Sequence, residues 1–145
     1  MQDLLMDYLT QIISNISQAQ SEVLKEKQLQ YKISPNELRI IEIVGTSRKP
    51  KMMKDIAELM SMTKGGMTFL IDKLEKKGVV RRKQNDFDRR VLYIELTERG
   101  QKIFHDYNRN KYAILYKWVE NMNSLTKKII TEEFHKALKM AENAF

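Results

Sequence analysis

The chain of 145 residues contains no cysteine, which excludes disulfide bonds, thiolate catalysis, thiol-based oxidant sensing and cysteine-ligated zinc. Only two prolines and five glycines are present, so long helices with few loops are expected. No apolar run approaches the roughly 20 residues of a membrane span, and no signal peptide is recognisable at the N-terminus. We therefore expect a cytoplasmic protein without a membrane partner.

The residue types that usually carry catalysis or bind metals form no recognisable pattern. The two histidines, His105 and His135, are expected on different helices and lack a convincing cluster of further ligands. An enzyme would need an arranged nucleophile, an acid–base pair or a metal site, whereas the serines here are expected to cap helices. The sequence therefore predicts a protein that is not an enzyme, with no catalytic residues, no cofactor and no metal.

The charge balance is strongly basic. Lysine and arginine number 26 against 19 aspartates and glutamates, which gives a formal net charge of +7. Such a balance favours a polyanionic partner, either nucleic acid or an anionic membrane. Because many basic proteins bind neither, the arrangement of the charges has to decide.

Apolar residues that recur every three or four positions predict amphipathic helices along most of the chain. The predicted helices cover residues 3–29, 34–45, 53–60, 63–76, 97–122 and 124 to about 141. In the helix over 97–122, the apolar positions from Ile103 to Met122 are expected to form one broad buried face. The length predicts one domain over residues 1–145.

The ends of these helices carry suitable residues. Ser34, Pro35 and Glu37 have the spacing of a capping box with proline in the first turn, and Gly45 is expected to end that helix. Further N-caps are expected at Thr63, Thr97 and Ser124.

Residues 53–76 have the pattern of a helix-turn-helix. Ala57 suits the close approach of the two helices, and the neighbouring apolar positions predict a shared core. These positions are Ile56, Leu59, Met67, Leu70, Ile71 and Leu74. With this face buried, the second helix presents a polar face that fits a groove of duplex DNA. The candidate DNA-binding residues of this helix are Thr63, Lys64, Gly65, Thr68, Phe69 and Lys73.

The roles of some of these residues stay open. Thr68 suits a base edge or a thymine methyl, while Lys64 and Lys73 suit bases or phosphates. The Gly65-Gly66 pair either lets the backbone approach DNA closely or is a slack helix start without a role. The Phe69 ring either meets a thymine methyl or packs on the neighbouring helix.

The residues that follow have the pattern of a β-hairpin with a basic tip. Val91, Tyr93 and Glu95 alternate with Leu92, Ile94 and Leu96, which is the period of a strand. The basic residues are Arg81, Arg82, Lys83, Arg89 and Arg90, against Asp86 and Asp88. A run of charge is by itself most simply a solvated face, but beside a helix-turn-helix it predicts a wing that enters the minor groove. Arg81, Arg89 and Arg90 are its candidate DNA-binding residues.

These elements predict a mainly α fold with a small β-hairpin wing. A winged helix-turn-helix covers residues 34–97, and long helices over 1–30 and 98–145 flank it. The apolar faces of the flanking helices are hard to bury against the central unit alone, so we expect them to join a second copy in a homodimer. The alternative is that they fold back on the monomer.

The chain resembles the multiple antibiotic resistance regulator (MarR) family of dimeric winged-helix repressors. The resemblance is carried by Asp55-Ile56-Ala57-Glu58-Leu59, by Met67-Thr68 with the run from Leu70 to Gly78, by Asp88-Arg89-Arg90, and by Leu96-Thr97 with Gly100. It implies a homodimer held by the terminal helices on a pseudo-palindromic operator in double-stranded DNA. It also implies that Arg90 enters the minor groove and that Asp88 orients it.

The resemblance further implies a small-molecule effector, which in this family is typically a weakly acidic aromatic or lipophilic compound that releases DNA. Arg39, near the second helix, is a candidate anion partner for such a ligand. The sequence departs from the family pattern at Phe69, where a polar or basic residue is common, and at Gly65-Gly66.

Two other readings of the same pattern remain. A winged helix with a basic wing can serve as a protein-interaction module that docks an acidic partner, or as an architectural protein that binds DNA without sequence preference. RNA binding is disfavoured because the pattern lacks an exposed aromatic stacking sheet.

Overall fold

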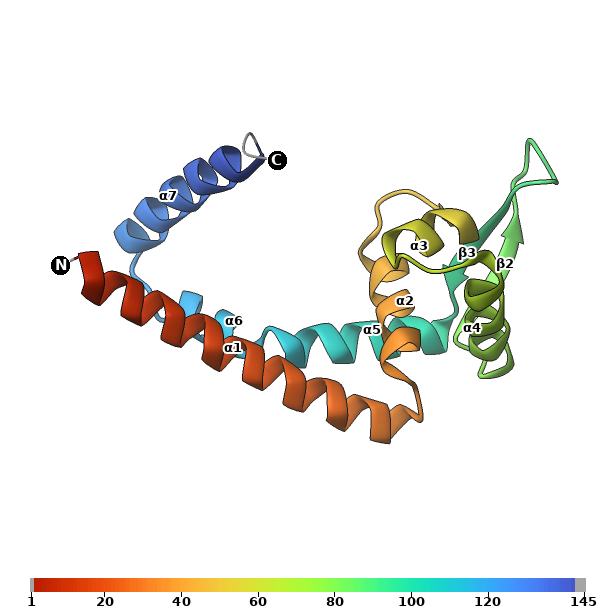
Figure 1. The fold of residues 1–145 in the computed structure, drawn as a ribbon, viewed down its shortest axis with the longest axis horizontal. Coiled ribbons are helices and arrows are strands. Elements are labelled where there is room, and N and C mark those ends of the chain that lie inside the picture. The colour runs from red at the N-terminus through yellow and green to blue at the C-terminus, as the bar shows by residue number, and fades with distance from the viewer. Residues whose placement is uncertain (1, 143–145) are drawn as a thin grey trace. The chain divides into compact units, whose positions relative to one another are not determined.

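The computed structural model describes residues 2–142 as seven helices and three short strands. Contacts divide these residues into two units, one up to Lys111 and one from Tyr112 onwards. In the first unit the order is α1 (Gln2–Tyr31), α2 (Pro35–Thr46), β1 (Lys51–Met52), α3 (Met53–Leu59), α4 (Lys64–Lys76), β2 (Val80–Gln84), β3 (Leu92–Leu96) and α5 (Glu98–Lys111) (Figure 1). The second unit contains α6 (Ala113–Glu120) and α7 (Ser124–Glu142). No helix among residues 2–142 combines the length and apolar character needed to cross a membrane.

Helix α2 begins as the sequence predicts. The Ser34 hydroxyl accepts a hydrogen bond from the Glu37 backbone N–H, and the Glu37 carboxylate accepts one from the Ser34 N–H at 2.7 Å. The prediction that Gly45 ends the helix is wrong, because α2 continues to Thr46. Gly45 is instead required for packing: a Cβ there would lie 2.4 Å from the Phe104 ring of α5.

The sheet is antiparallel with the strand order β1-β3-β2. The predicted hairpin pairs Val80 with Leu96 and Gln84 with Leu92. The third strand, β1, was not predicted, because its two residues are too few to show an alternating pattern. Lys51 and Met52 pair with Ile94 and Tyr93 and so bring the start of α3 against the hairpin.

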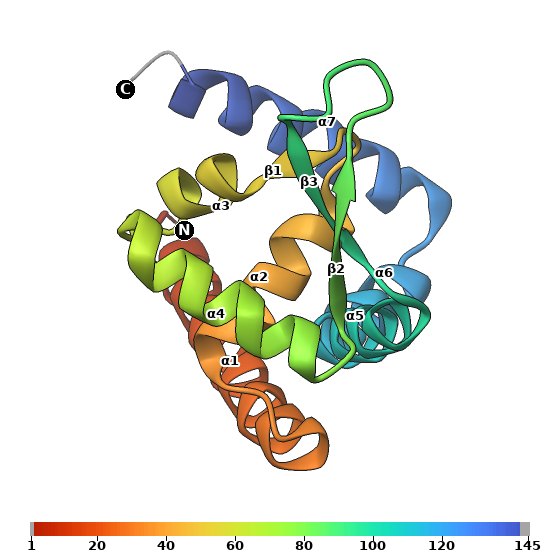
Figure 2. The same ribbon diagram turned by 90° about the vertical axis from the view of Figure 1, so that its right-hand side faces the viewer.

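The core of the first unit lies between the sheet and helices α2 to α5 (Figure 2). Its least exposed residues include Ile40, Ile41, Ile56, Met67, Ile71, Leu74, Val79 and Ile103. Five of the six apolar positions predicted for the helix-turn-helix core are buried. The sixth, Leu59, is 60% exposed, because α3 ends at this residue and the chain turns away through Ser61, whose φ is 51°.

Two glycines, Gly78 and Gly100, shape the join between α4, β2 and α5. Gly78 has a φ of +67°, a conformation that side chains rarely adopt. At Gly100, in the first turn of α5, a Cβ would lie 2.1 Å from the Val79 carbonyl oxygen. Thr97 closes the same corner: its hydroxyl lies 2.6 Å from the Gly78 carbonyl oxygen and accepts from the Gly100 N–H, as expected of an N-cap.

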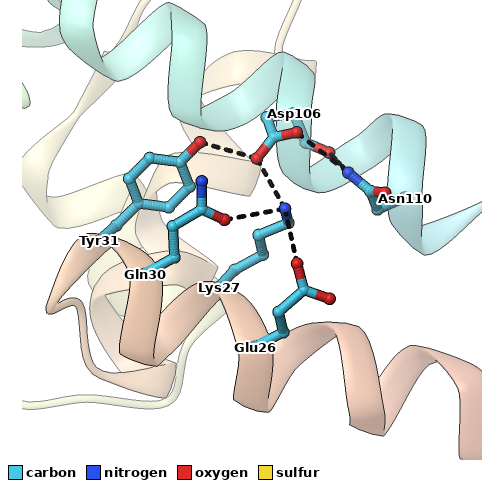
Figure 3. A network of polar contacts seen from close by, with 6 residues as sticks. All are labelled: Glu26, Lys27, Gln30, Tyr31, Asp106 and Asn110. Carbon is cyan, nitrogen blue, oxygen red and sulfur yellow. Dashed lines mark hydrogen bonds and ion pairs between the residues drawn. The ribbon is translucent and has the colours of Figure 1, made fainter.

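Helices α1 and α5 are joined by a polar network built on a buried lysine (Figure 3). Lys27 is 5% exposed, and its Nζ lies 2.8 Å from Asp106 Oδ2 and 3.2 Å from Glu26 Oε1. The Tyr31 hydroxyl donates to the same Asp106 oxygen at 2.7 Å. Burial would lower the pKa of Lys27, but the hydrogen bonds to Asp106 and Glu26 outweigh it and the pKa is raised. The pair with Asp106 is therefore charged at neutral pH.

The single helix predicted over 97–122 is wrong. It is interrupted at Tyr112, which has φ −106° and ψ 8° and separates α5 from α6. No glycine or proline marks the break, so the sequence pattern could not place it. In the single copy, Ile103, Phe104 and Tyr107 of the predicted face are buried, whereas Ile114, Trp118 and Val119 of α6 are more than 40% exposed.

The cap of the last helix is one residue away from its predicted position. Asn123 accepts a hydrogen bond from the Thr126 N–H at 2.8 Å through its side-chain oxygen, so Asn123 caps α7 and Ser124 is its first residue. Both residue types suit an N-cap, and the sequence does not decide between neighbours.

Candidate nucleic-acid interface

The outward face of α4 is fixed by a cap at its start and by a buried stripe along its length. Thr63 Oγ1 accepts from the Gly66 N–H at 3.1 Å, as predicted for an N-cap. Met67, Leu70, Ile71 and Leu74 are buried against the core. Because this stripe is packed against the core, the opposite face of α4 is exposed to solvent along most of the helix.

The two glycines in the first turn of α4 differ in their surroundings. A Cβ at Gly66 would lie 3.2 Å from Thr63 Oγ1 and 3.3 Å from the Met62 methyl carbon, so Gly66 belongs to the tightly packed cap. A Cβ at Gly65 would meet nothing within 4 Å. Gly65 therefore leaves the helix backbone open to close approach from outside, while Gly66 has a local structural role.

The predicted contact residues of α4 lie on this outer face, with one difference. Thr63, Lys64, Gly65, Phe69 and Lys73 are exposed. Thr68 is only half-exposed, and its hydroxyl lies 2.9 Å from the Lys64 carbonyl oxygen and 3.8 Å from Met53 Sδ.

Phe69 does not pack on a neighbouring helix. Its side chain is 59% exposed, and the Lys73 ammonium lies 4.7 Å from the centroid of the ring. The sequence left two roles open for Phe69. Its exposure excludes one of them, packing on a neighbouring helix of residues 2–142.

Charge is distributed unevenly along α4. No acidic residue occurs between Thr63 and Phe69, whereas Asp72 and Glu75 follow in the second half. Arg82 of β2 neutralises both: its Nη2 lies 2.7 Å from Asp72 Oδ1, and its Nη1 bonds to Glu75. The N-terminal half of α4 is therefore the end that suits an anionic ligand.

Arg82 also ties the wing to the helix. Its backbone N–H donates to Glu75 Oε1 at 3.0 Å in addition to the two side-chain contacts. The sequence places Arg82 in the basic wing but gives no sign of this role, because Asp72 and Glu75 lie ten and seven residues away on another element. The hairpin thus takes a fixed position beside α4.

The remaining basic residues of the strands are paired as well. Glu95 of β3 lies 3.1 Å from Arg81 Nη2 and 3.2 Å from Lys83 Nζ. Arg81, a predicted DNA contact, is 65% exposed and so still reaches solvent, but part of its charge is offset by Glu95. The free positive charge of the wing lies elsewhere.

That charge lies at the tip of the hairpin. The side-chain oxygen of Asn85 accepts from the N–H groups of Phe87 and Asp88, and its amide donates to the Tyr93 hydroxyl at 2.9 Å. Asp88 Oδ1 accepts from the Arg90 backbone N–H at 2.9 Å, which orders the chain at Arg90. The arginines at 89 and 90 are exposed, and neither guanidinium is ion-paired within residues 2–142.

Sequence reasoning overlooked two residues of this tip. Asn85 shapes the turn through its side chain, a role for which asparagine in a polar loop is the only signal. Phe87 is fully exposed at the end of the wing.

Arg39, the predicted anion partner, lies at a pocket formed by α1, α2 and α5. The pocket has a volume of about 270 Å³, and its walls include Leu24, Leu38 and Tyr107. Arg39 Nη1 lies 3.2 Å from Glu42 Oε2, and Lys111 also bonds to Glu42. Two cations and one carboxylate therefore line this pocket beside its apolar residues. Separately, no cluster of three His, Asp or Glu residues that could hold a metal ion occurs within residues 2–142.

Helix α4, with its exposed outer face, lies beside a basic hairpin, and comparison with known protein families finds a match for the same part of the chain. Residues 33–92 match the sequence profile of the MarR family. Over these residues the chain is similar to the MarR family. The matched region contains α2, α3, α4 and the hairpin up to the first residue of β3, which is the part of the chain that carries the candidate site.

Curated relatives of this chain carry names of transcriptional regulators. The uncharacterized HTH-type transcriptional regulator YfiV of Bacillus subtilis (strain 168) is 33% identical over 92 residues, which cover 63% of this chain and 58% of YfiV. The HTH-type transcriptional repressor MdtR of the same organism is 29% identical over 92 residues, which cover 63% of this chain and 57% of MdtR. The chain thus spans less than two thirds of the length of these relatives. A family of transcriptional regulators is not a family of enzymes, in agreement with the prediction from the sequence.

Solved structures show the same fold over almost the whole chain. FabT of Streptococcus pneumoniae, crystallised in complex with DNA, superposes with a TM-score of 0.65 at 21% identity and covers 100% of both chains. The MepR Q18P mutant from multidrug-resistant S. aureus superposes with a TM-score of 0.69 at 19% identity and covers 94% of this chain and 96% of MepR. The predicted fold, a winged helix-turn-helix with long helices on both sides, is confirmed.

Proposed function

We propose that this chain is a transcriptional regulator that binds double-stranded DNA in a sequence-specific manner. The observation that carries the proposal is the pairing of two surfaces: the acid-free first half of α4 and the unpaired arginines of the wing tip. Arg82 holds the two in a fixed relation through Asp72 and Glu75. A rigid pair of basic elements suits two adjacent grooves of one duplex.

In this proposal the two surfaces have different tasks. Helix α4 lies in the major groove, where base edges distinguish all four base pairs. The wing tip places Arg90 in the minor groove, whose negative potential attracts arginine. The hydrogen bond from the Arg90 N–H to Asp88 supports an orienting role for Asp88, although the contact is made to the backbone.

We further propose that the protein acts as a homodimer on a pseudo-palindromic operator. The first half of α1 exposes a row of large apolar residues that includes Leu5, Leu9 and Ile12. The second unit does the same at Trp118, Ile129 and other positions of α6 and α7. Exposed apolar patches of this kind mark interfaces, and two-fold symmetry is the commonest way in which a chain covers its own patch.

A repressor released by a small acidic ligand is the form of regulation that we propose. The pocket at Arg39 is small, about 270 Å³, and combines an apolar wall with the cations Arg39 and Lys111. An aromatic or lipophilic acid would place its carboxylate at these cations in competition with Glu42. Among the relatives, MdtR carries the name of a repressor. A DNA-binding transcriptional regulator is expected in the cytoplasm, as proposed from the sequence.

The test is a pull-down of genomic fragments with purified full-length protein at about 150 mM salt, followed by footprinting. The expected result is a short two-fold symmetric footprint near a promoter. Each neutralised phosphate should contribute about −0.9 to the slope of log affinity against log salt concentration. Diffuse binding without a preferred site would instead indicate an architectural protein, and no duplex binding at this salt would indicate a protein-interaction module.

A further inference from the structure

Phe69 occupies an unusual position for a large apolar side chain. It lies in the second turn of α4, on the face opposite the buried stripe, and is 59% exposed. A side chain of this size contributes most when it is buried, and here the fold leaves it in solvent. Its location on the helix that carries the proposed base contacts points to DNA as the surface that covers it.

The neighbours of Phe69 reinforce this interpretation. Gly65, Phe69 and Lys73 are four residues apart and therefore form one row along the outer face of α4. Gly65 has open space around its α-carbon, so the helix can come close to a ligand beside the ring. The Lys73 ammonium lies 4.7 Å from the centroid of the Phe69 ring. A positive charge therefore lies on the C-terminal side of Phe69, and Gly65 lies on its N-terminal side. Along the outer face of α4, the row therefore consists of an accessible backbone at Gly65, the apolar ring of Phe69 and the cation of Lys73.

The largest apolar group that the major groove offers to such a ring is a methyl group. The C5-methyl of thymine projects there, whereas the other base edges present hydrogen-bond donors and acceptors that a phenyl ring cannot satisfy. A cytosine or purine opposite Phe69 would leave polar atoms desolvated without a partner.

We propose that Phe69 is a specificity-determining residue that selects thymine in each half-site by contact with the C5-methyl group. Lys73 holds the ring through its cation–π contact and directs its own charge to the adjacent phosphate. The proposal rests on sequence-specific DNA binding by α4 and adds which base is read and by which side chain.

The neighbouring Thr68 is the alternative reader of the same methyl group. Its γ-methyl could make an apolar contact, but Thr68 is only half-exposed and its hydroxyl is held against Lys64 and Met53. Thr68 therefore lies on the flank of the outer face, while Phe69 projects from it. The experiment has to separate these two residues.

The experiment begins with selection of a preferred duplex from random sequence by the full-length protein. Each thymine of the selected site is then replaced by uracil, which removes only the C5-methyl group and keeps base pairing. Affinity is measured by fluorescence anisotropy at one salt concentration for the wild type and for the variants Phe69→Ala, Thr68→Ser and Phe87→Ala.

For the wild type, we expect uracil at one particular thymine of a half-site to weaken binding about fourfold, the size of burying one methyl group. In Phe69→Ala the same replacement should have no effect, while Thr68→Ser and Phe87→Ala should keep it. Phe87→Ala is the matched control, because it removes an exposed ring from the wing, which is assigned to the other groove. Since Phe69 is exposed, Phe69→Ala should unfold at the same temperature as the wild type.

Three outcomes would overturn the proposal. In the first, a selected site shows no sensitivity to uracil at any thymine. In the second, the sensitivity persists in Phe69→Ala and disappears in Thr68→Ser, which assigns the methyl contact to Thr68. Both leave sequence-specific binding intact. If selection yields no preferred site, the proposed function fails together with this inference.

Discussion

Charged side chains of the first unit divide into those that hold the fold together and those left free at its surface. Arg82 and Lys77 each bond to carboxylates from another element, at Asp72 and Glu75 and at Glu37 respectively. Arg89 and Arg90 at the wing tip have no ion pair within residues 2–142. A count of basic residues therefore overstates the charge that is available to DNA.

The first prediction concerns Arg90. Arg90→Ala should weaken binding to the selected operator by roughly 1–3 kcal/mol, the scale of one specific contact, because the side chain enters the minor groove. Fluorescence anisotropy with the operator and with an unrelated duplex measures the loss and its specificity. Arg109→Ala, which removes an exposed arginine from the C-terminal end of α5, is the control for net charge. Unchanged operator affinity in Arg90→Ala would remove the wing from the proposed interface.

The second prediction concerns the pH dependence of stability. Glu37 is 1% exposed, and burial alone would raise its pKa, but hydrogen bonds from Lys77 and Ser34 outweigh burial and lower the pKa below its ordinary 4.5. The folded state therefore binds the Glu37 proton less tightly than the unfolded state. The resulting stability is fully present above the ordinary pKa and is lost as pH falls from about 5 through the lowered value.

Urea unfolding between pH 7 and pH 3.5 measures this dependence. Glu37→Gln should be less stable than the wild type at pH 7, and the difference should shrink as the pH falls, because the wild-type carboxylate becomes protonated. Glu133→Gln, which changes an exposed glutamate on α7, should follow the wild-type curve. A constant difference between wild type and Glu37→Gln at every pH would show that the carboxylate charge contributes nothing.

At the scale of elements, α1 contacts α5 through one polar network and through apolar side chains. Lys27 is buried, and Asp106, Glu26 and Gln30 supply its acceptors. Asp106 is held further by Tyr31 and Asn110. Hydrogen bonds from Lys27 and Tyr31 lower the pKa of Asp106, so this carboxylate stays ionised at neutral pH.

The third prediction follows from the burial of the Lys27 charge. Asp106→Ala should lower the free energy of unfolding by roughly 3 kcal/mol, because it leaves a buried ammonium without its principal partner. Lys27→Met should cost less, since it removes the charge and keeps the apolar stem. Urea unfolding at one protein concentration compares the two variants. Equal losses would mean that the cost comes from losing the Lys27–Asp106 contact itself and that an unpaired ammonium at this position adds nothing.

The same scale shows what the sequence could predict and why. The capping box of α2 and the buried stripe of α4 depend on residues close together in the chain, and both were predicted correctly. Strand β1 exists only through pairing with β3, about 40 residues away, and the contact of Arg82 with α4 also joins different elements. The break at Tyr112 has no glycine or proline to mark it. Local pattern therefore placed the helices, and contacts between elements decided the rest.

At the scale of the whole molecule, the apolar surface is the feature that the monomer does not explain. Large apolar side chains are more than one third exposed along α1, α6 and α7, whereas the winged-helix lobe (residues 34–97) buries most of its own. Such surface is unfavourable in water, and burying it costs no polar desolvation. A second copy of the chain is therefore the partner that we propose for these helices.

The fourth prediction tests that partner on α7. Ile129 is 52% exposed, and Ile129→Glu should shift the protein from dimer to monomer, because a charge placed in an apolar interface loses its hydration without gaining a partner. Sedimentation equilibrium over a range of concentrations measures the shift. Lys128→Glu, which introduces the same side chain at the adjacent exposed position, should remain a dimer.

Operator binding by the same two variants links assembly to function. A monomer has one α4 and one wing, so Ile129→Glu should bind a single half-site and lose the affinity that simultaneous binding of two half-sites provides. Lys128→Glu should protect both half-sites of the footprint. If Ile129→Glu stays dimeric at all concentrations, the exposed row of α7 is not the interface. Dimerisation would then have to depend on the apolar residues of α1 and α6, where Trp118→Glu is the corresponding variant.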